Sequence, residues 1–106
     1  MSRNISIQTL IARHADGGFV LDVREPSEYV AGHVPGAVLA PMSRITSMLG
    51  GVPKDRPVHV ICQTGNRSQS MADLLCALGY DAVSVDGGTS AWTAAGRPVV
   101  TGARAA

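Results

Sequence analysis

The sequence has almost no charge imbalance and no long apolar run, and each lack excludes a class of protein. Nine Lys and Arg residues stand against eight Asp and Glu residues, which leaves a net charge of +1. That balance gives no electrostatic basis for binding nucleic acid or an anionic membrane. No apolar run approaches the roughly 18 residues that span a bilayer, and residues 1–6 lack the apolar core of a secretion signal. We therefore expect a cytoplasmic protein with no nucleic-acid or membrane partner.

Cysteine and histidine are also few. The chain has two Cys and three His, without the close Cys/His spacing of a zinc site, so we expect no metal. If a helix runs from about residue 68 to residue 78, Cys76 lies roughly 12 Å along it. That separation from Cys62 exceeds the Cα limit of roughly 7 Å for a disulfide. Two free thiols suit a reducing compartment.

What the sequence does contain is an alternation of short apolar runs with amphipathic ones. At 106 residues and 45% hydrophobic content, the chain suits one domain, with a core from about residue 5 to residue 100 and a frayed tail at 101–106. The alternation predicts an α/β domain with a mostly parallel sheet. We expect strands at Ile5 and at 19–22, 37–39, 58–61 and 81–85, and helices after Ser6 and over 25–31, 42–49, 68–78 and the segment around Trp92.

Three of the predicted strands end in a polar or reactive residue: Asp22, Cys62 and Asp86. Ligands of open α/β sheets bind beyond the C-terminal ends of the strands. Of the three, Cys62 has the most informative surroundings, because a tight turn and a helical pattern follow it. Inward-facing amides and a helix N-terminus favour an anion there, and the same field favours thiolate over thiol. We expect Cys62 to be a nucleophile with a lowered pKa.

Three motifs in this order carry a family resemblance. They are residues 19–37 (FVLDVREPSEYVAGHVPGA), residues 62–67 (CQTGNR), and Gly87-Gly88 followed by Trp92 and 96–99 (GRPV). Together they strongly resemble the signatures of rhodanese-like domains. The resemblance implies a three-layer fold in which helices cover both faces of a central five-stranded parallel sheet.

The resemblance also implies an activity: a thiosulfate sulfurtransferase that passes sulfane sulfur through a persulfide on Cys62. The donor would be thiosulfate or a related compound, the acceptor cyanide, a small thiol or a protein thiol, and no cofactor would be needed. The amides of the loop from Gln63 to Ser68 would hold the anion, and Arg67 would neutralise the donor or the leaving sulfite. The expected substrate-binding residues are Gln63, Thr64, Gly65, Asn66, Arg67 and Ser68.

Two other functions compete with this one. Phosphatases and arsenate reductases on the same fold resemble the loop but carry one more residue between cysteine and arginine. Only four residues separate Cys62 from Arg67, a ring better sized for one terminal sulfur than for a phosphoryl group. The other rival is a non-enzymatic rhodanese module used for docking or regulation, which would need neither the cysteine nor the loop.

Four further residues are expected to support the site rather than react. Asp22, Arg24 and Glu28 suit an ion-pair set that fixes the turn from strand to helix. His33 suits a hydrogen bond that orders the turn after it. Cys76 lies at the edge of its helix face, and we interpret it as structural.

Overall fold

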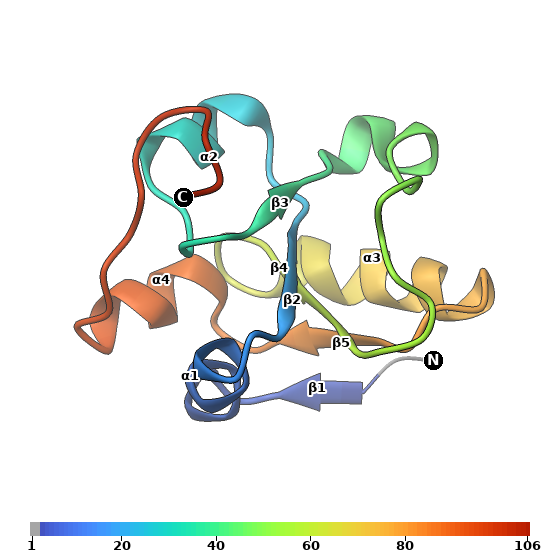
Figure 1. The fold of residues 1–106 in the computed structure, drawn as a ribbon, viewed down its shortest axis with the longest axis horizontal. Helices are drawn as coiled ribbons and strands as arrows, with labels where there is room; N and C mark the ends of the chain where they lie inside the picture. The colour runs from blue at the N-terminus through green and yellow to red at the C-terminus, as the bar shows by residue number, and fades with distance from the viewer. Residues whose placement is uncertain (1–2) are drawn as a thin grey trace.

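The computed structural model describes residues 3–106 as a five-stranded sheet flanked by helices (Figure 1). The strands are all parallel, as expected, and they lie in the order β1-β5-β4-β2-β3. The elements are β1 (Arg3–Ile5), α1 (Ile7–Ala15), β2 (Phe19–Asp22), α2 (Pro26–Ala31), β3 (Val38–Leu39), the 3-10 helix η1 (Met42–Ser47), β4 (Val58–Ile61), α3 (Asn66–Ala77), β5 (Ala82–Val85) and α4 (Gly88–Ala94).

Strand β4 is the centre of the sheet and delivers Cys62. Its Val60 pairs with Leu21 of β2 on one side and with Ser84 of β5 on the other. In this register the C-terminal ends of the three strands share one edge, so Asp22, Cys62 and Asp86 all come to that edge. The expected grouping of strand ends is therefore observed.

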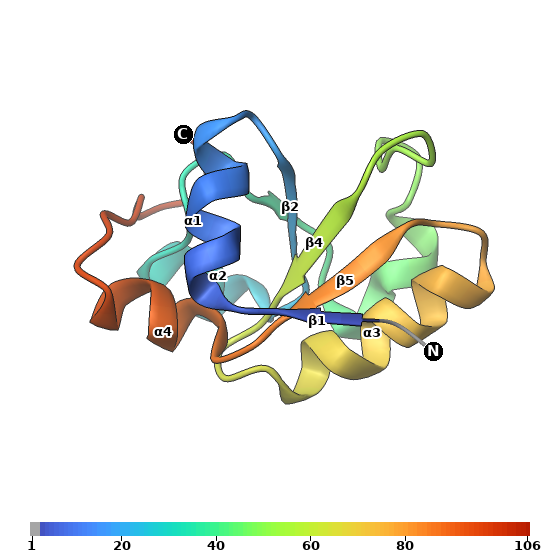
Figure 2. The ribbon, with the colours of Figure 1, turned by 90° about the horizontal axis from the view of Figure 1, so that it is seen from below.

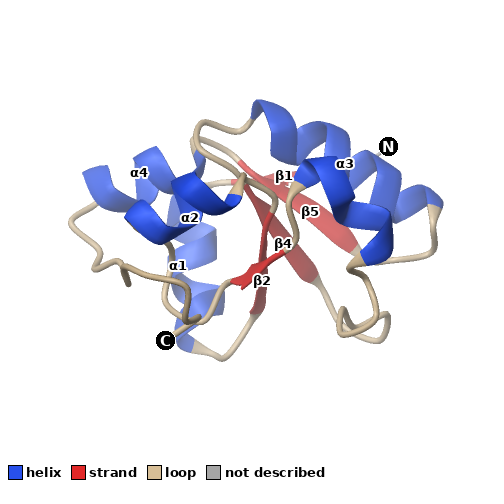
Figure 3. Cartoon of the chain, turned by 90° about the horizontal axis from the view of Figure 1, so that it is seen from above, coloured by secondary structure: helices blue, strands red, loops and turns tan. Residues whose placement is uncertain are grey.

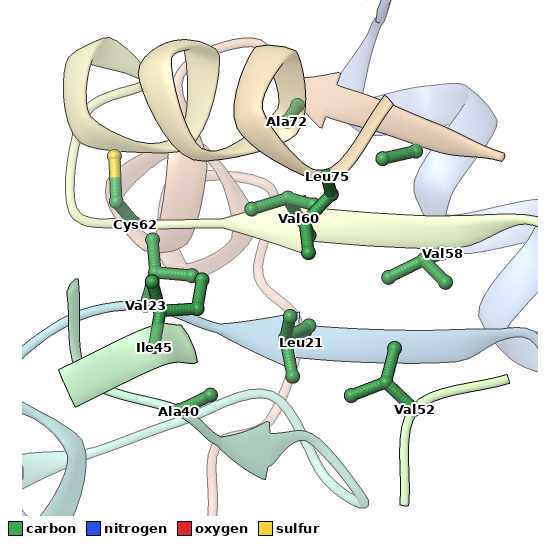
Figure 4. Close-up of a cluster of buried hydrophobic side chains, with 11 residues drawn as sticks. Leu21, Val23, Ala40, Ile45, Val52, Val58, Val60, Cys62, Ala72 and Leu75 are labelled. Carbon is green, nitrogen blue, oxygen red and sulfur yellow. The ribbon is translucent and has the colours of Figure 1, made fainter. Parts of the chain in front are cut away.

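Alternate residues of the strands face two separate apolar clusters. Val58, Val60 and Cys62 point to the cluster beneath α3 and η1 (Figure 4), whereas Ile61 points to the cluster beneath α1, α2 and α4. Both faces of the sheet are thus covered (Figures 2 and 3), which explains why β4 and β5 are buried at every position. Within residues 3–106, no helix combines the length and apolar character needed to cross a bilayer.

The helix starts follow local capping chemistry. Ser6 caps α1 by accepting a hydrogen bond from the amide of Thr9, as predicted. Helix α2 begins with Pro26 at its first position and a capping box between Glu25 and Glu28. Helix α3 starts two residues earlier than we expected. The segment expected to be helical over 42–49 is a 3-10 helix that ends at Ser47 and has non-helical backbone at Arg44.

The C-terminal residues differ from our expectation of a frayed end. The chain returns beside α2 (Figure 1), where the carbonyl of Ala105 accepts a hydrogen bond from the amide of Gly36 at 2.7 Å. The carbonyl of Arg104 lies 2.7 Å from Nε2 of His33, whose Nδ1 lies 2.8 Å from the carbonyl of Tyr29. Because His33 is fully buried, the tail supplies a partner that solvent does not.

Removing residues 104–106 should lower the free energy of unfolding by about 1–3 kcal/mol, because a buried ring nitrogen and an amide lose their acceptors. Urea denaturation followed by circular dichroism measures the change. The matched control is Arg104→Ala, which removes an exposed side chain but keeps the carbonyl, and it should leave stability unchanged. Equal stability of the truncated and full chains would contradict the assigned role of the tail.

Candidate functional site

Cys62 is the first residue after β4, and its side chain lies under the start of α3 (Figure 4). The residue is only 1% exposed. Its Sγ accepts a hydrogen bond from the amide of Gly65 at 3.1 Å and lies 3.5 Å from Oγ of Ser68. The sulfur therefore sits inside the turn that connects the central strand to the helix.

Two opposing effects set the pKa of the Cys62 thiol. Burial is the largest single effect and acts to raise the pKa. Against it act hydrogen bonds from the Ser68 hydroxyl and from the amides of Ser68, Gly65 and Thr64, and together they lower the pKa below its ordinary value of 9.0. The loop thus stabilises the thiolate, which is the nucleophilic form.

Ser68 connects the sulfur to the neighbouring strand. Its Oγ lies 2.9 Å from Oγ of Ser84 and 3.1 Å from the carbonyl of Gly65, and both serines are buried. A hydroxyl has one proton to donate and can accept others. When Cys62 is ionised, Ser84 can donate to Ser68 and Ser68 to the sulfur, so two buried hydroxyls face the charge in sequence.

The loop is fixed from behind by the start of α4. The carbonyl of Cys62 accepts hydrogen bonds from the amide and the hydroxyl of Thr89, at 2.8 and 3.0 Å. The carbonyl of Gln63 accepts one from the amide of Ser90 at 3.0 Å. A Cβ at Gly88 would lie 2.4 Å from the carbonyl oxygen of Cys62, so only glycine permits this approach. These bonds anchor the first two peptide groups of the loop to α4.

Gly65 makes the turn itself possible. It has φ +112°, which side chains rarely adopt, and it is the residue that caps α3. A Cβ there would also lie 3.3 Å from the amide nitrogen of Gly87. The conformation therefore favours glycine here, and a side chain would also crowd the turn before α4.

A second network ties the loop to β2. Arg24 is 2% exposed, and its guanidinium donates to both carboxylate oxygens of Asp22, at 2.8 to 3.1 Å, and to the carbonyl of Gly32 at 2.9 Å. It also donates to Oε1 of Gln63 at 3.0 Å, while Nε2 of Gln63 donates to Ser90 at 2.9 Å. The Gln63 side chain thus bridges the buried ion pair and α4.

Arg67 makes a bidentate ion pair with Glu28 of α2. The two nitrogen–oxygen distances are 2.6 and 2.8 Å. Hydrogen bonds from Arg67, with smaller help from the Glu25 amide and the charge of Arg24, outweigh burial and lower the pKa of Glu28 from 4.5 to about 2. Whatever this pair adds to stability is present above pH 4.5 and lost as the pH falls toward about 2.

The histidines and the second cysteine lie away from the sulfur. His33 stacks on Tyr29 with 3.6 Å between ring centroids, and it orders the turn and the tail described above. His14 contacts the carbonyl of Pro35, and Nδ1 of His59 contacts that of Phe19. Cys76 is a free thiol directed at the carbonyl of Ala82. Over residues 3–106, no group of three or more His, Cys, Asp or Glu side chains is placed to hold a metal ion.

The structure divides the predicted site residues into two groups. Thr64, Gly65 and Ser68 surround the Cys62 sulfur. The side chains of Gln63 and Arg67 instead contact Arg24, Ser90 and Glu28, and Asn66 begins α3. Glu28 is therefore not part of the Asp22–Arg24 pair, contrary to the single ion-pair set that we expected.

Three contributors were missed by the sequence analysis: Ser84, Thr89 and Ser90. Ser84 is a polar residue in an otherwise apolar buried strand, a signal that could have drawn attention to it. Thr89 and Ser90 act largely through backbone amides, which leave no mark in the sequence. Their role depends on how α4 packs against the loop.

The chain is similar to known proteins over most of its length. Residues 6–95 match the family model described as the Rhodanese-like domain. The chain is 36% identical over 91 residues to the thiosulfate sulfurtransferase GlpE of Pseudomonas entomophila, covering 85% of this chain and 84% of that protein. It is 38% identical over 88 residues to the protein of the same name from Pseudomonas putida, covering 82% of this chain and 80% of that protein. The crystal structure of a rhodanese-related protein from Thermoplasma volcanium superimposes with a TM-score of 0.87 at 34% identity, covering 94% of this chain and 99% of that one.

Ser68→Ala should raise the pKa of Cys62, because the thiolate loses the hydroxyl that donates to it. A hydrogen bond to a charged group contributes about 1.5–3 kcal/mol, so alkylation by iodoacetamide near neutral pH should slow about tenfold or more. Mass spectrometry of the peptide that carries Cys62 measures the rate across pH. Ser70→Ala, an exposed position on the same helix, is the matched control. Unchanged reactivity of Ser68→Ala would rule out this contribution.

Proposed function

Since the chain belongs to the rhodanese-like domain family, we propose that it is a sulfurtransferase that moves sulfane sulfur from thiosulfate, or a related anionic donor, to cyanide or a thiol. The observation that carries the proposal is the Cys62 sulfur. It is buried, its pKa is lowered, and amides and a hydroxyl surround it in a loop of four residues between cysteine and arginine. A thiolate held this way is a nucleophile that needs no separate base.

In the first half-reaction the Cys62 thiolate attacks the outer sulfur of thiosulfate. A new bond forms between the two sulfurs, the bond of the donor breaks, and sulfite leaves with the electron pair. No proton moves, because the attacking group is already ionised. The product is a persulfide anion on Cys62, whose charge lies on the outer sulfur.

In the second half-reaction an acceptor removes that sulfur. Cyanide attacks the outer sulfur and leaves as thiocyanate, or a thiolate attacks it and leaves as a persulfide. Cys62 regains the electron pair and returns to the thiolate form. The amides of Thr64, Gly65 and Ser68 and the Ser68 hydroxyl stabilise the negative charge in every state, as preorganised donors do in an oxyanion hole.

The same features weigh against the two rival functions. A phosphoryl group presents three oxygens and needs a wider ring of donors, whereas the amides here converge on one sulfur. A docking module would have no use for a buried thiolate with a hydroxyl pair behind it. Sulfur transfer uses each of these features.

Cys62→Ser should abolish thiocyanate release from thiosulfate and cyanide, because the hydroxyl cannot form the persulfide. Cys76→Ser is the matched control and should keep full activity, since its thiol faces the carbonyl of Ala82. Treatment with thiosulfate alone should add about 32 Da, one sulfur atom, to the peptide with Cys62.

Two results would argue against sulfur transfer. Equal background thiocyanate release by the wild type and Cys62→Ser would favour the docking module. Cys62-dependent hydrolysis of p-nitrophenyl phosphate at a rate comparable to sulfur transfer would favour a phosphatase.

Gly88→Ala should lower kcat/KM for sulfur transfer by about a hundredfold, the scale of a displacement of about 1 Å at a reacting group. The new Cβ would meet the carbonyls of Cys62 and Gln63 and push the loop away from α4. Gly96→Ala is the matched control: Gly96 also has a positive φ, +77° against +57°, but a Cβ there would meet nothing within 4 Å. Equal losses in both variants would mean that backbone strain, not the loop contact, is responsible.

A further inference from the structure

Two arginines lie at the active-site loop, one within it and one in contact with it, and each is neutralised by a carboxylate. Arg24, which contacts the loop through Gln63, forms a buried pair with Asp22, with side chains 2% and 0% exposed. Arg67, in the loop itself, pairs with Glu28, with side chains 34% and 32% exposed. Neither arginine is therefore an unpaired cation. The partial positive charges that stabilise a thiolate here come from amides and hydroxyls.

The two pairs differ in what an arriving anion can do to them. The Asp22–Arg24 pair is enclosed and also bonded to Gly32 and Gln63. The Arg67–Glu28 pair is partly exposed. The pKa of Arg67 is raised mainly by its hydrogen bonds to Glu28 and to a smaller degree by the negative charge of Cys62, so Arg67 lies within electrostatic reach of the sulfur. An anionic donor that approaches Cys62 would meet Arg67 together with the carboxylate that cancels its charge.

We infer that Glu28 determines whether this site prefers a sulfur donor with one negative charge or one with two. This inference rests on the proposed function and extends it to the donor class. By holding Arg67 in a bidentate pair, Glu28 weakens the attraction of the site for dianions such as thiosulfate, and so favours donors with a single negative charge. Specificity of this kind arises from a repulsive element as much as from an attractive one. Glu28 is a positioning residue, because it acts through Arg67 and takes no part in the bond exchange.

The chemistry supplies two matched donors that differ in charge. Thiosulfate is a dianion, and methanethiosulfonate is a monoanion in which a methyl group replaces one charged oxygen. In both, the Cys62 thiolate attacks the outer sulfur; sulfite leaves in the first case and methanesulfinate in the second. The electrostatic gain from one freed cation scales with the charge of the donor. Thiosulfate should therefore respond more than methanethiosulfonate.

Glu28→Gln removes the charge with little change of shape, and glutamine still suits the capping box with Glu25. It should raise kcat/KM for thiosulfate about fivefold, through a lower KM, which is the size of a partly exposed charge interaction of about 1 kcal/mol. For methanethiosulfonate the gain should be only about twofold. Steady-state kinetics with cyanide as acceptor measure both. A merely structural role predicts the opposite sign, since a loosened Arg67 would raise KM.

Two controls isolate the ion pair. Glu25→Gln removes a carboxylate from the same end of α2, one that accepts from Ser43 rather than from Arg67, and it should not change the ratio of the two donors. In the Arg67→Ala background, Glu28→Gln removes only the direct repulsion between its own carboxylate and the donor. Its gain should therefore be smaller than in the protein that has Arg67 free to contact the donor.

Binding without turnover separates this inference from the proposed function. The affinity for thiosulfate is measured by isothermal titration calorimetry in Cys62→Ser and in Cys62→Ser/Glu28→Gln. The double variant should bind thiosulfate about fivefold more tightly than the single variant. If the wild type forms no persulfide, the proposed function fails and this binding arm still decides the role of Glu28. Three results would each overturn the inference: thiosulfate binding or kcat/KM that is unchanged or weaker in the proteins carrying Glu28→Gln, equal gains for both donors, or a gain that is undiminished without Arg67.

Discussion

The hydrogen bonds that converge on the sulfur of Cys62 are the interaction on which this structure depends. Burial alone would keep the thiol neutral, and only the amides of Thr64, Gly65 and Ser68 with the Ser68 hydroxyl reverse that tendency. The first two carbonyls of the loop, those of Cys62 and Gln63, are bonded to the start of α4. A helix from the far end of the chain therefore helps to hold the loop that carries these amides.

Buried polar groups elsewhere in the molecule serve the same loop. Across residues 3–106, every buried side-chain nitrogen and oxygen has a hydrogen-bond partner, although the ion pair of Asp22 and Arg24 lies in the interior. Burial of two charges costs several kcal/mol per ion unless further hydrogen bonds satisfy them. Here those bonds go to Gly32 and Gln63, and they connect β2, the turn after α2 and the loop in one network.

The electrostatics of the site come from dipoles more than from ions. Arg67 is the one cation in the sequence of the loop, and taken alone it predicts strong attraction for an anion. Its bidentate pair with Glu28 changes that prediction, since the net charge of the pair is zero. What remains for the sulfur is a set of amides and hydroxyls that stabilise one negative charge at short range, which is the requirement of a thiolate.

The sequence by itself determined the order and type of most elements and the parallel sheet, and it singled out Cys62 as the candidate nucleophile. Those features arise from local patterns: apolar runs, capping at Ser6, and a glycine in a turn between strand and helix. Only the tertiary structure decided which partners meet. Glu28 and Arg67 lie 39 positions apart, Ser68 and Ser84 lie 16 apart, and the tail reaches His33 from residue 104. Contacts of that kind depend on strand register and helix packing, which sum over the whole core and leave no local signal.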